Sequence, residues 1–130
     1  MTKNYQKVRD YVIDLDYDIS HEDESNGVLV VNDPSSGISN LVLGCADPIL
    51  IMEQFILELQ DDSNGTLKKL LQKNRDIIHG AFVLDETGRK VIFRNTLELE
   101  NLDLNELEAS FNSLGLLLSE YSNDLITFSK

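Results

Sequence analysis

Three short β-prone segments, each followed by a turn or a break, occupy the first third of the chain and constrain its fold most strongly. Residues 17–22 alternate apolar and polar side chains, residues 28–31 form a β-branched run, and residues 38–45 alternate again. Turn-forming residues lie between them at 25–27 and 32–37. Three consecutive strands joined by short turns predict an antiparallel meander.

Helical periodicity is expected on both sides of this meander. Near the start of the chain, four side chains recur at spacings of three and four and predict an amphipathic first helix: Tyr5, Val8, Val12 and Leu15. After the meander, Asp47 can cap free backbone N–H groups, and Pro48 is suited to the first position of a helix. We therefore expect a second helix over residues 48–59.

This second helix carries more apolar surface than one narrow face can bury. Its main stripe consists of Ile49, Met52, Phe55 and Ile56, and further apolar residues widen it. At ~25 cal/mol per Å² of apolar area, exposing several such side chains costs several kcal/mol. The stripe is therefore interpreted either as a dimer or partner interface, where Met52 would adapt to irregular packing, or as core against the sheet.

The second half of the chain predicts a short helix, a hairpin and a long closing helix. Residues 66–71 predict the short helix, and two β-prone runs at 80–84 and 90–94 flank a polar loop containing Gly88. A seam at spacings of three and four predicts the closing helix: Leu104, Leu107, Phe111, Leu114, Leu118, Tyr121 and Leu125. Asp103 and Glu106 resemble a capping box at its start. Gly115, inside this helix, is expected where another backbone approaches closely.

The complete pattern predicts an α+β fold in the order α-β-β-β-α-(short α)-β-β-α, with an antiparallel sheet and helices packed on it. We expect one domain over residues 1–130, because the sequence shows no internal repeat and no linker composition.

Charge and targeting signals restrict the possible partners. The chain has 11 Lys plus Arg against 23 Asp plus Glu, a net charge of −12, which argues against nucleic acid and anionic membranes as partners. Residues 68–75 are a local exception, because they include Lys68, Lys69, Lys73 and Arg75. The N-terminus has no apolar core of a secretory signal, and no run approaches the ~20 apolar residues that span a bilayer. A cytoplasmic protein is expected.

Reactive groups are few in this sequence. Cys45 is the only cysteine and is expected to be a small buried hydrophobe. His21 sits in an acidic run whose neighbours point to opposite faces of a strand, and His79 has no nucleophile at a recognisable spacing. Residues 61–65 superficially resemble a calcium loop, but the glycine falls in the wrong position. We expect no catalytic residue, no metal site and no cofactor.

Short sequence patterns in the second half resemble the type III secretion chaperone-like family, in its Tir-chaperone and YbjN-like groups. A pattern of two leucines, two variable residues and an asparagine precedes a strand that contains Gly-Ala. The matching segments are Leu70-Leu71-Gln72-Lys73-Asn74, then residues 79–85, 88–91, 95–97 and 102–107. The resemblance covers residues 66–112 by motif and the whole chain by element order.

The resemblance implies a small cytoplasmic protein, usually a homodimer, without catalytic activity. Members that serve secretion hold an extended segment of a client protein, and YbjN-like members are loosely assigned as regulators. We therefore expect a chaperone-like or adaptor protein that binds a partner segment, with a regulatory or sensory domain for a small ligand or partner as the alternative. Capture is expected at the free edge of the meander or in an apolar groove between the first helix and the sheet.

Overall fold

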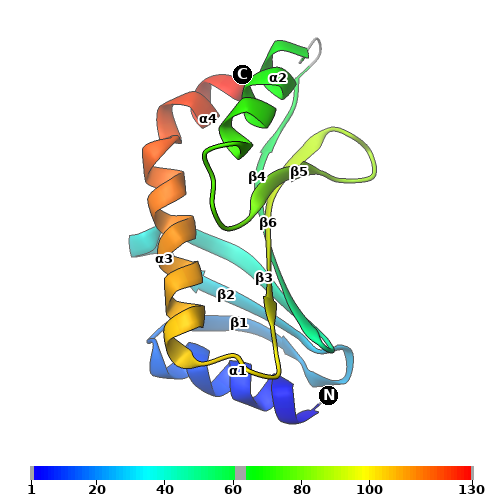
Figure 1. Cartoon of the computed structure of the whole chain (residues 1–130), viewed down its shortest axis with the longest axis vertical. Helices are drawn as coiled ribbons and strands as arrows, with labels where there is room; N and C mark the ends of the chain where they lie inside the picture. The colour runs from blue at the N-terminus through cyan, green and yellow to red at the C-terminus, as the bar shows by residue number, and fades with distance from the viewer. Residues whose placement is uncertain (1, 61–63, 130) are drawn as a thin grey trace.

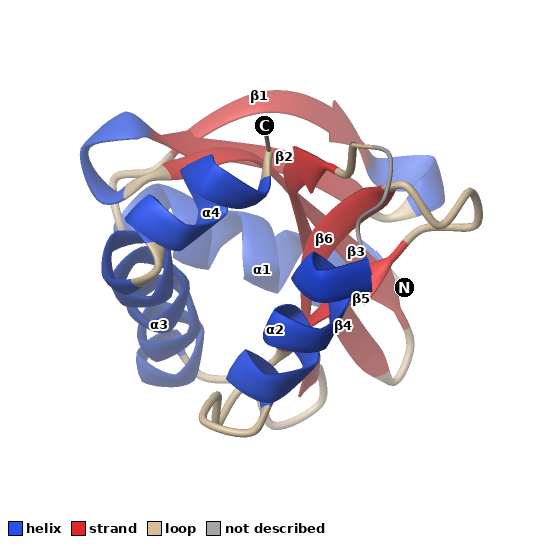
Figure 2. Cartoon of the chain, turned by 90° about the horizontal axis from the view of Figure 1, so that it is seen from above, coloured by secondary structure: helices blue, strands red, loops and turns tan. Residues whose placement is uncertain are grey.

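One antiparallel sheet with helices on its concave face organises the computed structural model, which describes residues 2–60 and 64–129 (Figures 1 and 2). The sheet has six strands in the order β1-β2-β3-β4-β6-β5. In chain order the elements are α1 (Thr2–Asp14), β1 (Asp18–Asp23), β2 (Val28–Asp33), β3 (Ile38–Ala46), β4 (Ile49–Glu58), α2 (Asn64–Asn74), β5 (Ala81–Leu84), β6 (Lys90–Glu98), α3 (Leu104–Glu120) and α4 (Ser122–Phe128). Single 3₁₀ turns, Glu24–Asn26 and Pro34–Ser36, join the first three strands.

The core lies between the concave face of the sheet and the helices (Figure 2). The helix α1 contributes the apolar face predicted from its spacing, and Tyr5, Val8 and Val12 are at most 1% exposed. Alternate residues of the strands point to the same core, among them Leu29 of β2 and Leu50 of β4, both fully buried. The opposite face of the sheet carries none of the described α-helices.

The expected helix at residues 48–59 is wrong, because this segment forms the strand β4. It pairs along its length with β3 on one side and with β6 on the other. Apolar residues occur on both faces of this strand, so its sequence also satisfies a helical period. Backbone pairing with two neighbours decides the conformation, since strand preference depends on context. The α+β class is confirmed, and the meander gains a fourth strand.

The other expected elements are confirmed, with one difference at the C-terminal end. The first helix, the three strands, the short helix and the hairpin of β5 and β6 all form. Asp103 caps α3, because its Oδ1 accepts a hydrogen bond from the backbone N–H of Glu106 at 2.7 Å. The closing helix breaks at Tyr121 into α3 and α4, and the apolar seam continues across the break to buried Leu125. No described helix is long and apolar enough to cross a membrane.

Gly115 of α3 lies where the turn before β3 comes closest to the helix. A Cβ atom at this position would lie 2.8 Å from the backbone oxygen of Ser36. Alanine normally stabilises a helix interior relative to glycine by about 1 kcal/mol. Here the contact with the backbone reverses the sign, as expected from the sequence.

Gly115→Ala is therefore expected to lower the free energy of unfolding by about 1 to 2 kcal/mol, measured by urea denaturation. Gly65→Ala is the matched control, because Gly65 also lies in a helix and a Cβ there meets nothing within 4 Å. The control is expected to be neutral or stabilising. A stabilised Gly115→Ala protein would contradict the close approach seen here.

Candidate functional site

An apolar groove runs between α2 and the edge strand β5. It has a volume of about 310 Å³ and is lined by Leu67, Leu70, Leu71, Asn74, Phe82, Val83, Leu84 and Val91. Every lining residue except Asn74 is apolar. Figure 1 shows α2 beside β5, at the end of the sheet opposite α1. The groove therefore lies at the β5 end of the sheet, away from the first helix.

The groove has a buried floor and an exposed rim. Leu70 and Phe82 are 4% and 6% exposed and form the floor. Leu71 is 70% exposed and Leu84 is 42% exposed, so both present apolar surface to solvent. A leucine exposed to this degree beside a concave apolar surface is typical of a binding site for another molecule.

Asn74 closes the middle of the β5 edge. Its Oδ1 accepts a hydrogen bond from the backbone N–H of Phe82 at 2.8 Å, and its Nδ2 donates to the Phe82 carbonyl oxygen at 3.1 Å. The side-chain amide thus takes the place of a neighbouring strand for one residue of the edge. This pair of bonds gives a structural reason for the asparagine of the Leu-Leu-x-x-Asn pattern.

Gly80, directly before β5, has a backbone conformation that suits glycine. Its φ is +91°, and a Cβ atom would lie 2.4 Å from Phe93 Cζ and 2.8 Å from the carbonyl oxygen of Arg94. Phe93 in turn packs edge-on against Phe82, with ring centroids 6.0 Å apart. The glycine of the Gly-Ala strand therefore sets the position of the aromatic floor of the groove.

The groove lies in the one basic region of an acidic chain. Residues 64–94 hold seven of the 11 Lys and Arg residues but three of the 23 Asp and Glu residues. Lys73 is engaged, because its Nζ lies 2.7 Å from Asp124 Oδ2 and 4.4 Å from the centre of the Tyr121 ring. Lys68 and Arg75 are exposed on α2 and on the turn after it. The groove thus lies in a basic part of the chain, and Lys68 and Arg75 directly follow its lining residues Leu67 and Asn74 in the sequence.

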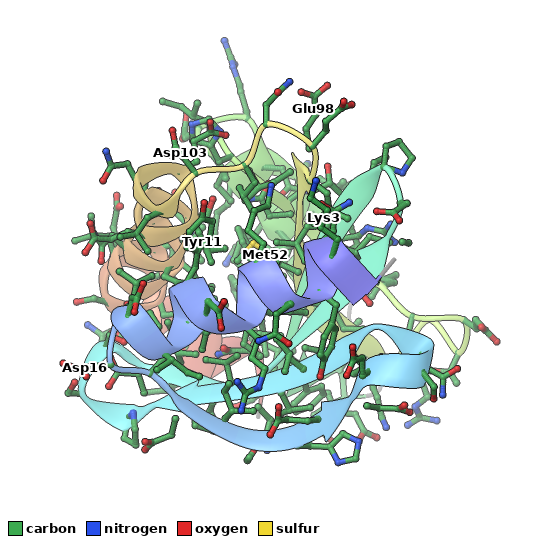
Figure 3. The ribbon with its side chains drawn as sticks, turned by 90° about the horizontal axis from the view of Figure 1, so that it is seen from below. Lys3, Tyr11, Asp16, Met52, Glu98 and Asp103 are labelled. Atoms are coloured by element: carbon green, nitrogen blue, oxygen red, sulfur yellow. The ribbon has the colours of Figure 1, made fainter. Side chains whose placement is uncertain are left out.

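The predicted interface residues do not share one face. Ile49 and Phe55 lie on the outer face of β4, 41% and 54% exposed, whereas Met52 is 3% exposed in the core. Viewed from below, Met52 lies behind α1 inside the molecule (Figure 3). Ile56 is half-buried at the irregularity where the pairing of β4 and β6 shifts. The grouping as a helical stripe is therefore wrong, and two of the four side chains remain on the surface.

The two capture sites expected from the sequence differ in character from the observed groove. The free edge of the meander is β1, where Asp18 and Glu22 are exposed and Glu22 pairs with Arg9 of α1. The boundary between α1 and the sheet is already filled by the buried face of α1. The apolar groove is found at α2 and β5, which sequence reasoning missed. Exposed Leu71, next to the recognised pattern, is the signal that could have indicated it.

The residues considered for chemistry are dispersed. His21 is exposed on β1, and His79 is exposed before β5. Within residues 2–60 and 64–129, no three His, Cys, Asp or Glu side chains gather in a way that could hold a metal ion. The segment at 61–65, whose resemblance to a calcium loop was rejected from its spacing, falls partly on residues 61–63, outside the described residues. Cys45 is buried as expected, and burial raises the pKa of its thiol to about 11, so it stays protonated at neutral pH.

Several solved structures share this fold, and three of them are described here. YbjN from E. coli, a proposed transcription regulator, superposes with a TM-score of 0.70 at 12% identity over 95% of this chain and 94% of its own. SchA, from the complex of that chaperone with the effector HopA1, gives a TM-score of 0.64 at 15% identity over 98% and 94%. SycH of Yersinia pestis, a type III secretion chaperone bound to a fragment of YscM2, gives a TM-score of 0.60 at 15% identity. The match covers 97% of this chain and 99% of SycH. At these identities the likeness shows the fold alone.

Sequence comparison identifies the family. A search of curated protein sequences finds no match. The sequence model of the CesT_Tir_1 family, in contrast, matches residues 1–130, the whole chain. This match agrees with the Leu-Leu-x-x-Asn and Gly-Ala patterns, whose asparagine and glycine hold the β5 edge in place. The chain therefore belongs to the CesT_Tir_1 family of type III secretion chaperone-like proteins.

Proposed function

We propose that the chain is a non-enzymatic cytoplasmic chaperone or adaptor, which binds a segment of a partner protein in the groove between α2 and β5. The observation that carries this proposal is the open apolar lining of the groove, with Leu71 70% exposed at its rim. Protein-binding grooves are apolar at their centre, as this one is. SchA and SycH, which share the fold, were each solved with a bound protein partner.

The proposal is tested by selecting peptides on the immobilised protein from a random display library. The selected peptides are then synthesised with a fluorophore, and their affinity is measured by fluorescence anisotropy. Leu71→Glu is expected to weaken binding at least about tenfold, because it places a charge in the apolar lining. The matched control is Leu116→Glu, since Leu116 of α3 is 71% exposed and lies outside the groove.

Two results would overturn the proposed function. One is the absence of any enriched peptide. The other is equal loss of binding in the Leu71 and Leu116 variants, which would indicate nonspecific attraction to exposed leucine. If binding is retained only for small molecules from a metabolite library, the regulatory alternative is favoured instead.

We further propose that the protein is a homodimer that uses the outer face of the sheet. Ile49 and Phe55 supply exposed apolar surface there, and Val42 of β3, 39% exposed, lies on the same face. The ion pair between Arg94 and Glu53, 3.7 Å apart, gives this face a polar element beside the apolar ones. Such a mixed patch suits a symmetric interface.

Phe55→Arg is expected to convert a dimer into a monomer in sedimentation velocity at tens of micromolar protein, because the substitution buries an unpaired charge in the interface. Ile126→Arg is the matched control, since Ile126 of α4 is 56% exposed and lies on the opposite side of the sheet. A wild-type protein that sediments as a monomer contradicts the dimer. So does a dimer that Phe55→Arg leaves intact.

A further inference from the structure

We propose that α4 is a releasable strap, which parts from the body of the protein at Tyr121 while the rest of the fold stays intact. Lys73 of α2 is the latch that holds this strap closed. Such a conformational change goes beyond the proposed function and needs no partner protein. It follows from the weak point between α3 and α4, from the few contacts that anchor α4, and from the two contacts that Lys73 makes with the strap and its hinge.

Tyr121 marks a weak point between two helices that share one apolar seam. Its φ of −100° and ψ of 9° depart from regular helical values. The Ser122 hydroxyl donates to the carbonyl oxygen of Ser119 at 3.1 Å, and serine bonds of this kind destabilise a helix slightly and bend it. Figure 1 shows α4 turning away from the line of α3 toward α2. Tyr121 is therefore the place where α4 can part from α3.

Few apolar contacts anchor α4. It has seven residues, Ser122–Phe128, of which Leu125 and Phe128 are buried, each 8% exposed. Helices of this length are not stable alone in water, so these two side chains must offset the entropy that is lost when the whole segment is ordered. An open cavity of about 450 Å³ also lies between α2 and α4, with Lys69 on one side and Thr127 on the other. Close packing against α2 therefore contributes little to holding α4.

Lys73 makes polar contacts that hold α4 in place. Its Nζ lies 2.7 Å from Asp124 Oδ2 in the first turn of α4 and 4.4 Å from the centre of the Tyr121 ring at the weak point. The Lys73 side chain is 19% exposed, so the ion pair is partly shielded from solvent. At the far end of the strap, Gln60 Nε2 donates to the carbonyl oxygen of Ser129 at 3.2 Å. Removing the Lys73 charge therefore weakens two of these three contacts at once.

The remainder of the core keeps its own packing when α4 is released. Phe111 and Leu114 of α3 are at most 1% exposed, and they belong to the part of α3 that precedes the weak point. Release of α4 exposes Leu125, Phe128 and the surface that they cover, and the freed segment then loses its helix. The exposure of this apolar surface is thus controlled by one ion pair, which added salt weakens.

Hydrogen exchange in the full-length protein tests the strap. The backbone N–H of Leu125 donates to the Tyr121 carbonyl oxygen at 2.9 Å, so the Leu125 amide exchanges when α4 opens. After correction for intrinsic rates, it is expected to exchange at least about a hundredfold faster than the Phe111 amide, because local opening requires less free energy than global unfolding. Low concentrations of urea are expected to accelerate the Phe111 amide more than the Leu125 amide, because global unfolding exposes more surface.

Lys73→Met tests the latch, because it keeps an unbranched side chain without the charge. It is expected to raise the exchange rate of the Leu125 amide about fivefold, through loss of the ion pair and of the contact with the Tyr121 ring. The matched control is Lys69→Met, since Lys69 is exposed one turn earlier on the same face of α2 and lines the same cavity. The control is expected to stay within about twofold of the wild type. Raising the salt from about 0.05 M to about 0.5 M is expected to accelerate the Leu125 amide more in the wild type than in Lys73→Met.

Val12→Ala separates opening of the strap from global unfolding. Val12 is fully buried in α1, at the end of the molecule away from α4 (Figure 1). The variant is expected to accelerate the Phe111 amide at least about tenfold, because it destabilises the whole fold. The Leu125 amide is expected to stay within about twofold of the wild type, because the contacts of α1 are kept when only the strap opens.

Three results would overturn the inference. A Leu125 amide as slow as the Phe111 amide would mean that α4 opens only when the whole fold does. The same conclusion would follow if Val12→Ala accelerated both amides equally. An unchanged Leu125 rate in Lys73→Met, or equal acceleration in Lys73→Met and Lys69→Met, would remove Lys73 as the latch. The proposed function is tested separately, because none of these measurements involves a partner.

Discussion

Gly80→Ala is expected to lower the free energy of unfolding by about 3 kcal/mol, as measured by urea denaturation. Two costs combine at this position. Alanine at a φ of +91° is strained by about 1 kcal/mol. Its Cβ would also lie 2.4 Å from Phe93 Cζ and 2.8 Å from the Arg94 carbonyl oxygen, and overpacking of this kind costs about 1 to 3 kcal/mol.

Gly88→Ala separates the two costs. Gly88 has a similar φ of +73°, but a Cβ there meets nothing within 4 Å. Gly88→Ala is expected to lower the free energy of unfolding by the backbone strain alone, about 1 kcal/mol. Equal losses at Gly80 and Gly88 would mean that the contact with Phe93 is absent in solution. In that case the position of Phe82 in the groove would also need another explanation.

The substitution Asn74→Ala is expected to lower the free energy of unfolding by about 2 kcal/mol. It is also expected to expose the backbone groups at the edge of β5. It leaves the N–H and C=O of Phe82, a residue only 6% exposed, without their side-chain partner. Leaving partly buried backbone groups unsatisfied costs about 1 to 3 kcal/mol. Asn101→Ala, at an exposed asparagine before α3, is the control and is expected to change stability by less than about 0.5 kcal/mol.

Hydrogen exchange gives this prediction a local readout. The Phe82 amide is expected to exchange faster in Asn74→Ala, whereas amides in the middle of the sheet change only with global stability. The opened edge is also expected to promote association of the variant at high concentration, because unpaired strand edges pair with other chains. An unchanged rate at Phe82 would contradict the edge-closing role of Asn74.

Local sequence patterns predicted most elements because tertiary contacts reinforce them. The spacing of Tyr5, Val8 and Val12 corresponds to a helix face that is buried against the sheet. Gly115 was expected near another backbone, and Ser36 lies there. The cap at Asp103 was recognisable because this aspartate stands three residues before Glu106, which is the spacing of a capping box.

The strand β4 shows where local patterns fail. Its apolar residues occupy both faces, so a period of 3.6 and a period of 2 fit the sequence equally well. What separates them is pairing with β3 and β6, and β6 lies about forty residues later in the chain. Asp47-Pro48 suggested a helix start, but these residues form the turn between two paired strands.

The groove could not be predicted for a related reason. Its lining comes from three elements, α2, β5 and β6, and depends on how closely they pack. The sequence does mark the individual parts: the leucines of α2, the basic residues around them, and the asparagine and glycine of the recognised pattern. Only their arrangement in space shows that Asn74 closes the edge while Leu71 remains exposed.

Chemical-shift mapping tests the central claim most directly, that the groove between α2 and β5 binds the partner segment. Backbone amide spectra of the isotope-labelled protein are recorded during titration with the tightest selected peptide. We expect the largest shifts at residues 67–75 and 80–84, and none of comparable size in Leu71→Glu. Shifts concentrated on the outer face around Ile49 and Phe55, or along β1, would contradict it.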